Sequence, residues 1–379
     1  MSDTACSCDT NAASGNQRPC FVRSAECITA FGDSSATLGK LLEGRVALAA
    51  TPALMADGGE LVPMALRGTF REGSPPRWWE DLLEFLSPVA SGGWGSARSP
   101  VFFASSNFGI DGLYLTGKRR SSADVPFSTP HGCVQRLRES MGWGPVCWIL
   151  SHACVSAQLA MDRAADAVSS RRADRALVVS FDYVGPFVSG GFHALKILNT
   201  DMPAPFGDVG IGSIGLGDGA GFVEISAEPS KFEIAALGTY NEMYHFTSTE
   251  PTGSGFRKLL EPMADRLRNC HPWIKGHGTG TLEPGRIEAR TLEEMLPSSP
   301  LVSWKGSIGH TLGSCAAVEL AIAMCAVDFG SIPGTVGARP PYFATNVMSA
   351  PFSPADHDSV LLLCNAFGGA HGSMLLRYD

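Results

Sequence analysis

The sequence predicts an α/β fold built from two related halves, each with a largely parallel sheet. Three observations lead to this prediction. Short apolar segments alternate with longer segments of helical periodicity along most of the 379 residues. Several apolar segments contain no alternating polar residues, which is typical of strands covered on both faces. Residues 146–168 and 302–324 also share one order of strand, polar turn and helix of small residues.

The first half is expected to run from residue 20 to about residue 226, after a disordered tail at residues 1–19. The tail is polar and small and lacks the basic start and apolar middle of a secretory signal. The elements expected next are a strand at 20–31, helices at 37–44 and 77–86, a strand at 100–106, a polar loop at 115–132 and a helix at 133–142. A strand at 146–150, a helix from Cys154 to Ser169 and a strand at 175–182 then form a right-handed βαβ unit, which implies a parallel sheet.

The second half, residues 227–379, repeats this style. Its expected elements are a helix at 256–269, a strand at 271–276, a helix at 286–296, a strand at 301–306, a helix at 314–327, and strands at 360–369 and 372–379 around a glycine turn.

Composition excludes several classes of protein. The net charge of -8 gives no overall attraction for nucleic acid or for an anionic membrane. Apolar runs such as 360–364 are too short to span a bilayer. The eleven scattered cysteines argue against a disulfide framework and favour the reducing cytoplasm. The spacing of Cys6, Cys8, Cys20 and Cys27 fits no zinc pattern, so we expect no metal.

A glycine pattern at Gly210, Gly212 and Gly215 imitates a dinucleotide-binding fingerprint. The context does not fit, because no strand is expected before it and the segment after it has the pattern of a strand. We therefore expect no bound nucleotide cofactor.

Cys154 is the first candidate for chemistry. It follows the apolar run 146–150 and opens a helical pattern. A thiol at a helix N-terminus lies against free N–H groups and the positive end of the helix dipole, which stabilise a nucleophilic thiolate. The alternative is a buried structural cysteine, which is the commoner role of a single free cysteine.

His277 and His310 also follow expected strands, in "GHGTGT" and "KGSIGH". Each alone could be a loop histidine with satisfied hydrogen bonds. Sites in parallel sheets collect at the carboxyl ends of strands, however, and Cys154 and both histidines are expected there. The three residues together therefore predict a catalytic site.

Four motifs in register resemble the β-ketoacyl-acyl carrier protein synthases that use two histidines. "HACVSAQLAMDRA" resembles their nucleophile helix, and "GHGTGT" with Glu288 resembles their first histidine motif. "KGSIGHTLGSCAAVEL" resembles their lysine and second-histidine motif, and "NAFGGAHGSMLL" their terminal glycine turn. The resemblance covers residues 20–379 and implies a thiolase-like fold, with two duplicated halves stacked as five αβαβα layers.

The resemblance also implies roles for single residues. Cys154 would take an acyl chain from a phosphopantetheine thioester, and His277 and His310 would promote decarboxylation of malonyl-acyl carrier protein. Lys305 and Glu319 would support the second histidine. Thr279 and Thr281 would bind the pantetheine arm. Phe367 and Gly368 belong to the terminal turn, and the resemblance leaves two roles open for Phe367. Its N–H would form an oxyanion hole with that of Cys154, or it would match the phenylalanine that gates the site.

The implied reaction is a decarboxylative Claisen condensation in a type II fatty-acid-like, polyketide or aryl-polyene pathway. Departures from the family pattern at Gly207 and Arg286, and a terminal motif with a single Phe-Gly step, favour a specialised pathway. The alternatives are a cysteine-dependent acyltransferase without condensation and a non-catalytic subunit that shapes a partner's acyl tunnel.

The implied partners are an acyl carrier protein and either a second copy of the chain or a related ketosynthase-like subunit. Phosphopantetheine would act as the substrate arm of the carrier, with no cofactor bound to the chain itself. Since a carrier protein is acidic, its docking patch should be basic. The candidates are 118–120, 171–172 and 257–258, although for any one of them ordinary solvated charges are the commoner interpretation.

Overall fold

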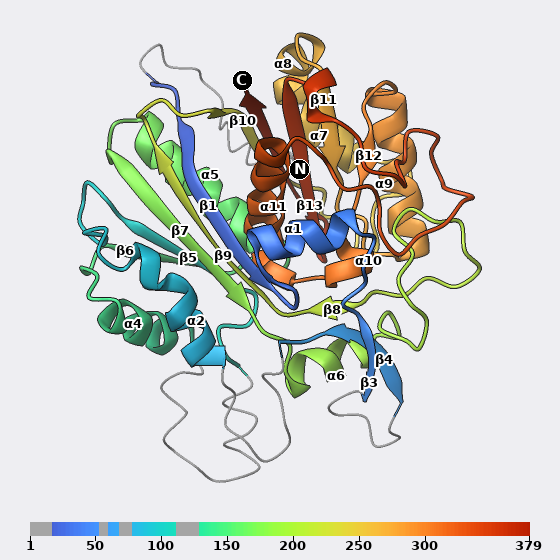
Figure 1. Ribbon diagram of the computed structural model, residues 1–379, viewed down its shortest axis with the longest axis horizontal. Coiled ribbons are helices and arrows are strands. Elements are labelled where there is room, and N and C mark those ends of the chain that lie inside the picture. The colour runs from blue at the N-terminus through green and yellow to red at the C-terminus, as the bar shows by residue number, and fades with distance from the viewer. Residues whose placement is uncertain (1–16, 53–59, 68–77, 111–128) are drawn as a thin grey trace, which may run out of the picture.

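The computed structural model describes residues 17–52, 60–67, 78–110 and 129–379. Its main feature is a continuous sheet, for which eleven strands are described. Figure 1 shows these strands as two groups with a helix, α11, between them. The two groups are joined where β1 pairs with β10, at Phe21 and Val22.

The first group of strands has the order β1-β9-β7-β5-β6. The first two neighbouring pairs are antiparallel, and β7-β5 and β5-β6 are parallel. The strands are β1 (Phe21–Thr29), β5 (Val101–Ala104), β6 (Cys147–Leu150), β7 (Arg175–Asp182) and β9 (Gly219–Ser226), and β1 also pairs with the short β2 (Gly32–Asp33). The predicted parallel arrangement around the strand at 175–182 is confirmed.

The second group repeats the first. Its order is β10-β14-β13-β11-β12, again with two antiparallel pairs followed by two parallel pairs. The strands are β10 (Phe232–Asn241), β11 (Pro272–Lys275), β12 (Leu301–Val302), β13 (Ser359–Ala366) and β14 (Ala370–Tyr378). In this correspondence β12 matches β6, so the segments that follow these two strands occupy equivalent places in the two halves.

Two helices of small residues form the central layer. Helix α5 (Ser156–Ser169) packs on β7 and β9 of the first group and on β10 and β14 of the second, while α11 (Cys315–Phe329) packs on β1, β9 and β13. Nearly every side chain of α11 is buried, because a helix that is apolar all round must be covered on all sides. The stretch Leu312–Phe329 is long and apolar enough to cross a bilayer by composition, but 83% of it is buried inside the fold.

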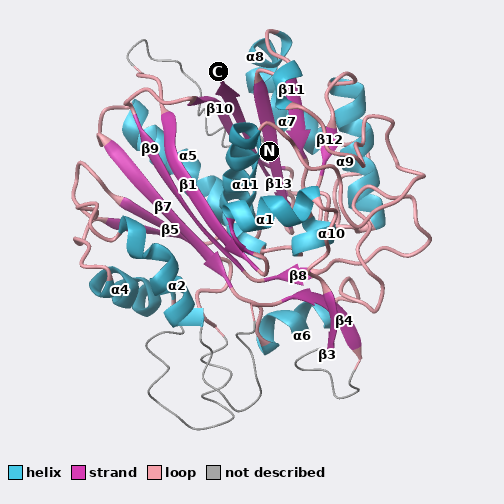
Figure 2. Cartoon of the chain, viewed as in Figure 1, coloured by secondary structure: helices cyan, strands magenta, loops and turns pink. Residues whose placement is uncertain are grey.

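Several of the other helices cover the outer faces of the two strand groups (Figure 2). They give five layers in the order helix, sheet, helix, sheet, helix, which confirms the predicted thiolase-like fold. The outer helices are α2 (Trp78–Leu86) and α4 (Pro130–Ser140) on the first group, and α7 (Ser254–Leu260), α8 (Ala264–Arg268) and α9 (Leu282–Met295) on the second. Helix α1 (Ser34–Leu42) packs against α11.

A small three-stranded sheet lies beside the main one. It consists of β3 (Ala49–Pro52), β4 (Leu61–Ala65) and β8 (Leu216–Gly217), and it shares an apolar cluster with α6 (Pro186–Ala194). The glycine-rich stretch at 210–215 precedes β8, and no helix follows it, as the sequence predicts. The short 3-10 turns are Ser87–Val89, Glu261–Met263, Leu312–Ser314 and Pro354–Asp356.

Several predicted boundaries are wrong, each for a local reason. Cys154 lies before its helix, because α5 begins at Ser156. The strand expected at 301–306 ends at Val302, and the short helix α10 (Lys305–Ile308) follows it. The helix expected at 256–269 is interrupted at Glu261–Met263, where Pro262 cannot donate a backbone hydrogen bond.

The strand before the nucleophile is also not covered on both faces, contrary to expectation. Among the described strands β6 is the edge of the first group, and its Trp148 and Ile149 side chains are 58% and 37% exposed. Apolar residues on an unpaired edge strand are unusual in a monomer.

Residues 1–16 of the expected tail lie outside the described residues. At its end, Arg18 donates from Nε to the Val168 carbonyl over 2.8 Å and from Nη2 to the Ala173 carbonyl over 2.5 Å. The chain is therefore anchored from Arg18 onward.

Candidate active site

The nucleophile candidate Cys154 sits in a tight turn between β6 and α5. Ala153 has a positive φ of 45°, which a non-glycine residue adopts only when its surroundings hold it there. The Ser156 hydroxyl does this: it accepts the His152 N–H over 2.7 Å and donates to the Ala153 carbonyl over 2.7 Å. This turn places the Cys154 side chain at the N-terminal end of α5.

The Cys154 sulfur faces one of the two predicted histidines. His310 Nε2 lies 3.0 Å from Sγ. Burial raises the pKa of the Cys154 thiol, and the positive charge of Lys305 offsets only part of this rise. The expected helix-stabilised thiolate is therefore not what the structure favours; instead the neutral thiol has a base within hydrogen-bond distance.

The second histidine, His277, completes the group. The ring centroids of His277 and His310 are 5.0 Å apart and the rings are nearly perpendicular, at 87°. Burial and the charge of Lys305 lower the pKa of both imidazoles well below the ordinary value. Their Nδ1 atoms are buried without a hydrogen-bond partner among the described residues. Both rings are therefore neutral near pH 7, and no hydrogen bond among the described residues fixes the tautomer of either ring at Nδ1.

A buried carboxylate holds the turn that carries His277. Glu288 on α9 accepts the backbone N–H of His277 over 2.5 Å and that of Gly278 over 3.0 Å. The Ser303 hydroxyl donates to the Gly278 carbonyl over 2.8 Å. Gly278 has φ 37°, and a Cβ there would come within 2.6 Å of Ser303 Cβ, so only glycine fits.

The small sheet holds the backbone of His310. The His310 N–H donates to the Gly215 carbonyl over 2.6 Å, and the His310 carbonyl accepts the Gly217 N–H over 3.0 Å. A Cβ on Gly217 would lie 2.1 Å from the Ile308 carbonyl oxygen. The glycine-rich stretch that imitated a nucleotide motif thus positions a histidine by close backbone contact.

The predicted pair Lys305 and Glu319 is present and deeply buried. Lys305 Nζ lies 2.5 Å from Glu319 Oε1, and the two side chains are 1% and 2% exposed. A third member, Lys275 at the end of β11, was not predicted, and its Nζ pairs with Glu319 Oε2. The available signal was a lysine in a strand that is otherwise apolar, since a buried charge needs a partner.

A cavity of about 450 Å³ contains the Cys154, His277 and His310 side chains. The four other predicted binding residues line the same cavity: Thr279, Thr281, Phe367 and Gly368. The hydroxyls of Thr279 and Thr281 are 3.0 Å apart. All the predicted residues except Lys305 and Glu319 therefore share one cavity, and those two lie in the buried layer behind the histidines.

Phe367 lies in the turn between β13 and β14, 39% exposed, with its ring centroid 6.0 Å from that of Phe192 on α6. The turn is tied to the loop after β10, because Gly368 N–H donates to the Phe246 carbonyl over 2.8 Å. His371, also missed from sequence, lines the cavity and lies 3.0 Å from a Glu242 carboxylate oxygen. Phe192, Phe367 and His371 all line the cavity.

The three candidate docking patches differ in their place relative to this cavity. Residues 118–120 lie outside the described residues. Arg171 and Arg172 follow the C-terminal end of α5, the end opposite Cys154. Arg257 and Lys258 lie on α7, just after the loop whose Thr249 and Pro251 line the cavity.

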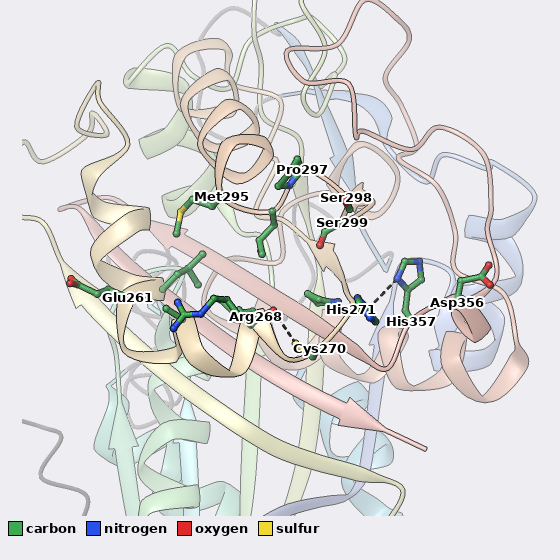
Figure 3. A pocket seen from close by; sticks show the side chains of 15 residues that line it. Glu261, Arg268, Cys270, His271, Met295, Pro297, Ser298, Ser299, Asp356 and His357 are labelled. Carbon is green, nitrogen blue, oxygen red and sulfur yellow. Dashed lines mark hydrogen bonds between the residues drawn. The ribbon is translucent and has the colours of Figure 1, made fainter.

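A second cavity of about 470 Å³ lies between α8, the end of α9 and the turn at 354–357, and Figure 3 shows its lining. It contains His271, His357 and Cys270. His357 Nδ1 lies 3.2 Å from the His271 carbonyl, and the Cys270 sulfur contacts the Leu267 carbonyl. It shares no lining residue with the cavity of Cys154.

The chain is similar in sequence to known β-ketoacyl synthases. The family model "Beta-ketoacyl synthase, C-terminal domain" matches residues 232–339, which include His277, Lys305, His310 and Glu319. The tetracenomycin polyketide synthase ketoacyl synthase alpha subunit of Streptomyces glaucescens is 28% identical over 268 residues. That match covers 64% of this chain and 62% of the relative.

Two solved structures share the whole fold. The complex AntDE:AntF, a type II PKS acyl-carrier protein with its ketosynthase bound to the hexaketide, aligns with a TM-score of 0.81 at 16% identity. It covers 96% of this chain and 100% of that chain. The ketosynthase ApeO in complex with its chain length factor ApeC, from Xenorhabdus doucetiae, aligns with a TM-score of 0.78 at 17% identity, covering 96% and 98%. Residues 232–339 thus match a β-ketoacyl synthase domain, and the two solved structures share the thiolase-like fold of the chain.

Proposed function

We propose that this chain catalyses a decarboxylative Claisen condensation between an acyl group held on Cys154 and a malonyl group on an acyl carrier protein. The observation that carries the proposal is the set of three side chains in one cavity. The sulfur of Cys154 is 3.0 Å from His310 Nε2, and His277 packs edge-to-face on His310.

In the first half-reaction the Cys154 sulfur attacks the carbonyl carbon of the acyl thioester. His310 Nε2 accepts the thiol proton as the C–S bond forms, and returns it to the pantetheine sulfur as the old C–S bond breaks. The products are the acyl-cysteine thioester and the free carrier thiol. A neutral histidine suits this role, because it begins with an empty acceptor nitrogen.

In the second half-reaction the malonyl thioester loses CO2. The electrons of the broken C–C bond move into an enolate whose oxygen is stabilised by N–H donors from His277 and His310. Preorganised donors of this kind are worth about 3 kcal/mol each. The enolate carbon then attacks the acyl group on Cys154, a C–C bond forms, and the departing cysteine thiolate takes a proton from solvent. The product is a 3-oxoacyl thioester on the carrier.

The remaining cavity residues have supporting roles in this proposal. Thr279 and Thr281 bind the pantetheine arm of the carrier, which enters as substrate. The backbone N–H groups of Cys154 and Phe367 stabilise the oxyanion of the first half-reaction. Glu319 pairs with Lys305, whose positive charge favours the neutral form of both histidines.

Two partners follow from the proposal. One is an acyl carrier protein, which we place against the basic residues Arg257 and Lys258 near the cavity. The other is a second ketosynthase-like subunit that pairs with the exposed β6 edge at Trp148 and Ile149. The solved complexes of similar proteins with a carrier protein and with a chain length factor support both partners. The pathway is a type II polyketide or fatty-acid-like system in the cytoplasm, where the nine free cysteines of the described residues would stay reduced.

The test is to follow each half-reaction separately with purified carrier proteins. Intact-mass analysis reports the acyl adduct on Cys154, and release of CO2 from malonyl-carrier protein reports the second step. An acyltransferase without condensation would form the adduct and release no CO2. A non-catalytic subunit would form no adduct.

A further inference from the structure

The loop that joins β10 to α7 carries a cluster of exposed apolar side chains. We call residues 242–253 the mouth loop. Its Met243, Tyr244 and Phe246 are 83%, 54% and 79% exposed. Large apolar side chains scattered singly over a surface are normal, but neighbouring ones form a patch, and such patches mark interaction sites. We therefore expect these three side chains to contact a partner.

Buried contacts hold both ends of the mouth loop. Glu242 Oε2 lies 3.0 Å from His371 Nε2, and Glu242 Oε1 accepts the Glu250 N–H over 2.9 Å. The Glu242 and His371 side chains are 3% and 2% exposed, and His371 Nδ1 lies 3.0 Å from Asn365 Oδ1. The Glu250 carboxylate in turn accepts the Ser254 N–H over 3.1 Å. The loop is thus tied to β13, to β14 and to the start of α7.

The exposed part of the loop is held as well. The Phe246 carbonyl accepts the Gly368 N–H over 2.8 Å. A Cβ on Gly369 would lie 2.5 Å from Glu242 Cγ, so the β13–β14 turn packs directly on the loop. Met243 has a positive φ of 49°, which a non-glycine residue adopts only when its surroundings hold it there. A loop fixed in advance loses little conformational entropy when a partner covers its side chains.

The mouth loop also forms part of the wall of the cavity that contains Cys154. Tyr244 lines this cavity and is half exposed, so the loop lies where the cavity meets the surface. Met243 and Phe246 do not line the cavity and lie outside it on the same loop. A macromolecule that brings a thioester to Cys154 past Tyr244 must therefore lie against them. The lining residues of the loop are Tyr244, Thr247, Ser248, Thr249 and Pro251.

The charges around the mouth loop favour an acidic partner. Residues 243–249 contain no carboxylate. Lys258 on α7 lies beside the stem of the loop, with Nζ 5.6 Å from the centre of the Tyr240 ring. Arg257 precedes it and pairs at the surface with Glu294. An apolar patch beside basic side chains is complementary to an acidic protein that exposes apolar groups.

Resting on the proposed function, we infer that Met243 and Phe246 are the apolar anchors by which an acyl carrier protein docks on the mouth loop. The carrier places its phosphopantetheine arm in the cavity beside Tyr244, and its acidic surface faces Lys258. A few buried anchors supply most of the affinity of an interface, whereas charges at its rim mainly raise the association rate. The affinity for the carrier therefore depends on Phe246 more than on Lys258.

The test measures binding of the carrier separately from catalysis. A fluorescently labelled type II polyketide acyl carrier protein is titrated with wild type, Phe246→Ser and Met243→Ser, and anisotropy gives the Kd. We expect each substitution to raise the Kd roughly tenfold, and Lys258→Met to raise it less than about threefold.

The matched control is Phe329→Ser. Phe329 is 69% exposed and ends α11, at the opposite end from Cys315, whose sulfur contacts the Cys154 carbonyl. This substitution removes an exposed phenylalanine far from the cavity, so it should change the Kd by less than about twofold.

Acylation of Cys154 supplies the second measurement. Because Met243 and Phe246 do not line the cavity, an acyl N-acetylcysteamine thioester should acylate both variants at the wild-type rate. With the same acyl group on the carrier, KM should rise in step with the Kd while kcat is kept.

Three results would decide against parts of this account. An unchanged Kd in both loop variants, or a larger loss in Lys258→Met than in Phe246→Ser, would overturn the inference. Dissociation of a dimer in analytical ultracentrifugation of Phe246→Ser would also overturn it, because a second subunit would then cover the loop. Wild type that binds the carrier but forms no adduct on Cys154 would instead count against the proposed function and leave the docking surface in place.

Discussion

Replacing His277 by alanine should separate the two half-reactions. His277 faces the cavity and the ring of His310, whereas the only histidine contact to the Cys154 sulfur described by the structure is from His310. His277→Ala should therefore remove a donor to the enolate and leave the acceptor of the thiol proton in place. His310→Ala cannot make this distinction, because it removes both.

The expected magnitude follows from the loss of one preorganised donor in a buried site. Such a loss lowers the rate by about 10²–10³, or roughly 2.7–4 kcal/mol in the barrier. The backbone should keep its place, since the His277 N–H is held by Glu288 whatever the side chain is. Acylation of Cys154 should then change by less than about threefold, because its own donors and base are untouched.

The assay uses single turnovers with each substrate: intact-mass growth of the acyl adduct on Cys154, and labelled CO2 release from malonyl-carrier protein. His357→Ala, in the second cavity, is the matched histidine control and should leave both rates unchanged. Equal loss of both half-reactions in a folded His277→Ala protein, or full retention of CO2 release, would refute the assigned role.

Four further predictions test the surroundings of the site. Glu319→Gln leaves two buried lysines facing a neutral amide, so its free energy of unfolding in urea should be lower by about 3–5 kcal/mol. The control Glu233→Gln, at an exposed ion pair, should change the free energy of unfolding by less than about 0.5 kcal/mol. Similar small losses in both variants would contradict a stabilising role for the buried ion pairs. Gly217→Ala forces a Cβ to within 2.1 Å of the Ile308 carbonyl oxygen and should displace His310, which should abolish condensation and lower the melting temperature. The control Gly39→Ala, which has open space around it, should leave the melting temperature unchanged or slightly higher. An active Gly217→Ala enzyme would show that the close contact is not needed. Because burial raises the pKa of Cys154, its alkylation by iodoacetamide should keep rising between pH 7 and pH 10, and a plateau near pH 7 would reveal a preformed thiolate instead. Trp148→Glu on the β6 edge should weaken subunit pairing in analytical ultracentrifugation without unfolding the chain, and an unchanged assembly would place the interface elsewhere.

The order of strands and helices was predictable because apolar runs and helical periodicity report directly on burial. The repeat of 146–168 and 302–324 anticipated two halves with the same strand order, which the sheet topology shows. Boundaries were less predictable where a single contact decides them. The turn at Ala153 depends on the Ser156 hydroxyl, and this contact moves the start of α5 past Cys154.

The catalytic residues were predictable from motif and place, whereas their electrostatics were not. The prediction of a thiolate at Cys154 did not include the burial of the sulfur, because burial depends on how the two halves pack together. Lys275 and Glu319 come from separate elements, β11 and α11, and only the folded chain brings them together as a buried ion pair. The exposed edge at Trp148 was missed for a similar reason, since an apolar strand can be covered by its own fold or by another subunit.

The central claim is that Cys154 carries an acyl group which a decarboxylated malonyl unit then removes. The most direct measurement is intact-mass analysis of the chain, supplied first with acyl-carrier protein and then with malonyl-carrier protein. We expect a mass gain of one acyl group, absent in Cys154→Ala, and its discharge with release of one CO2 per adduct. An adduct that persists after malonyl-carrier protein is added, or one that still forms in Cys154→Ala, would contradict it.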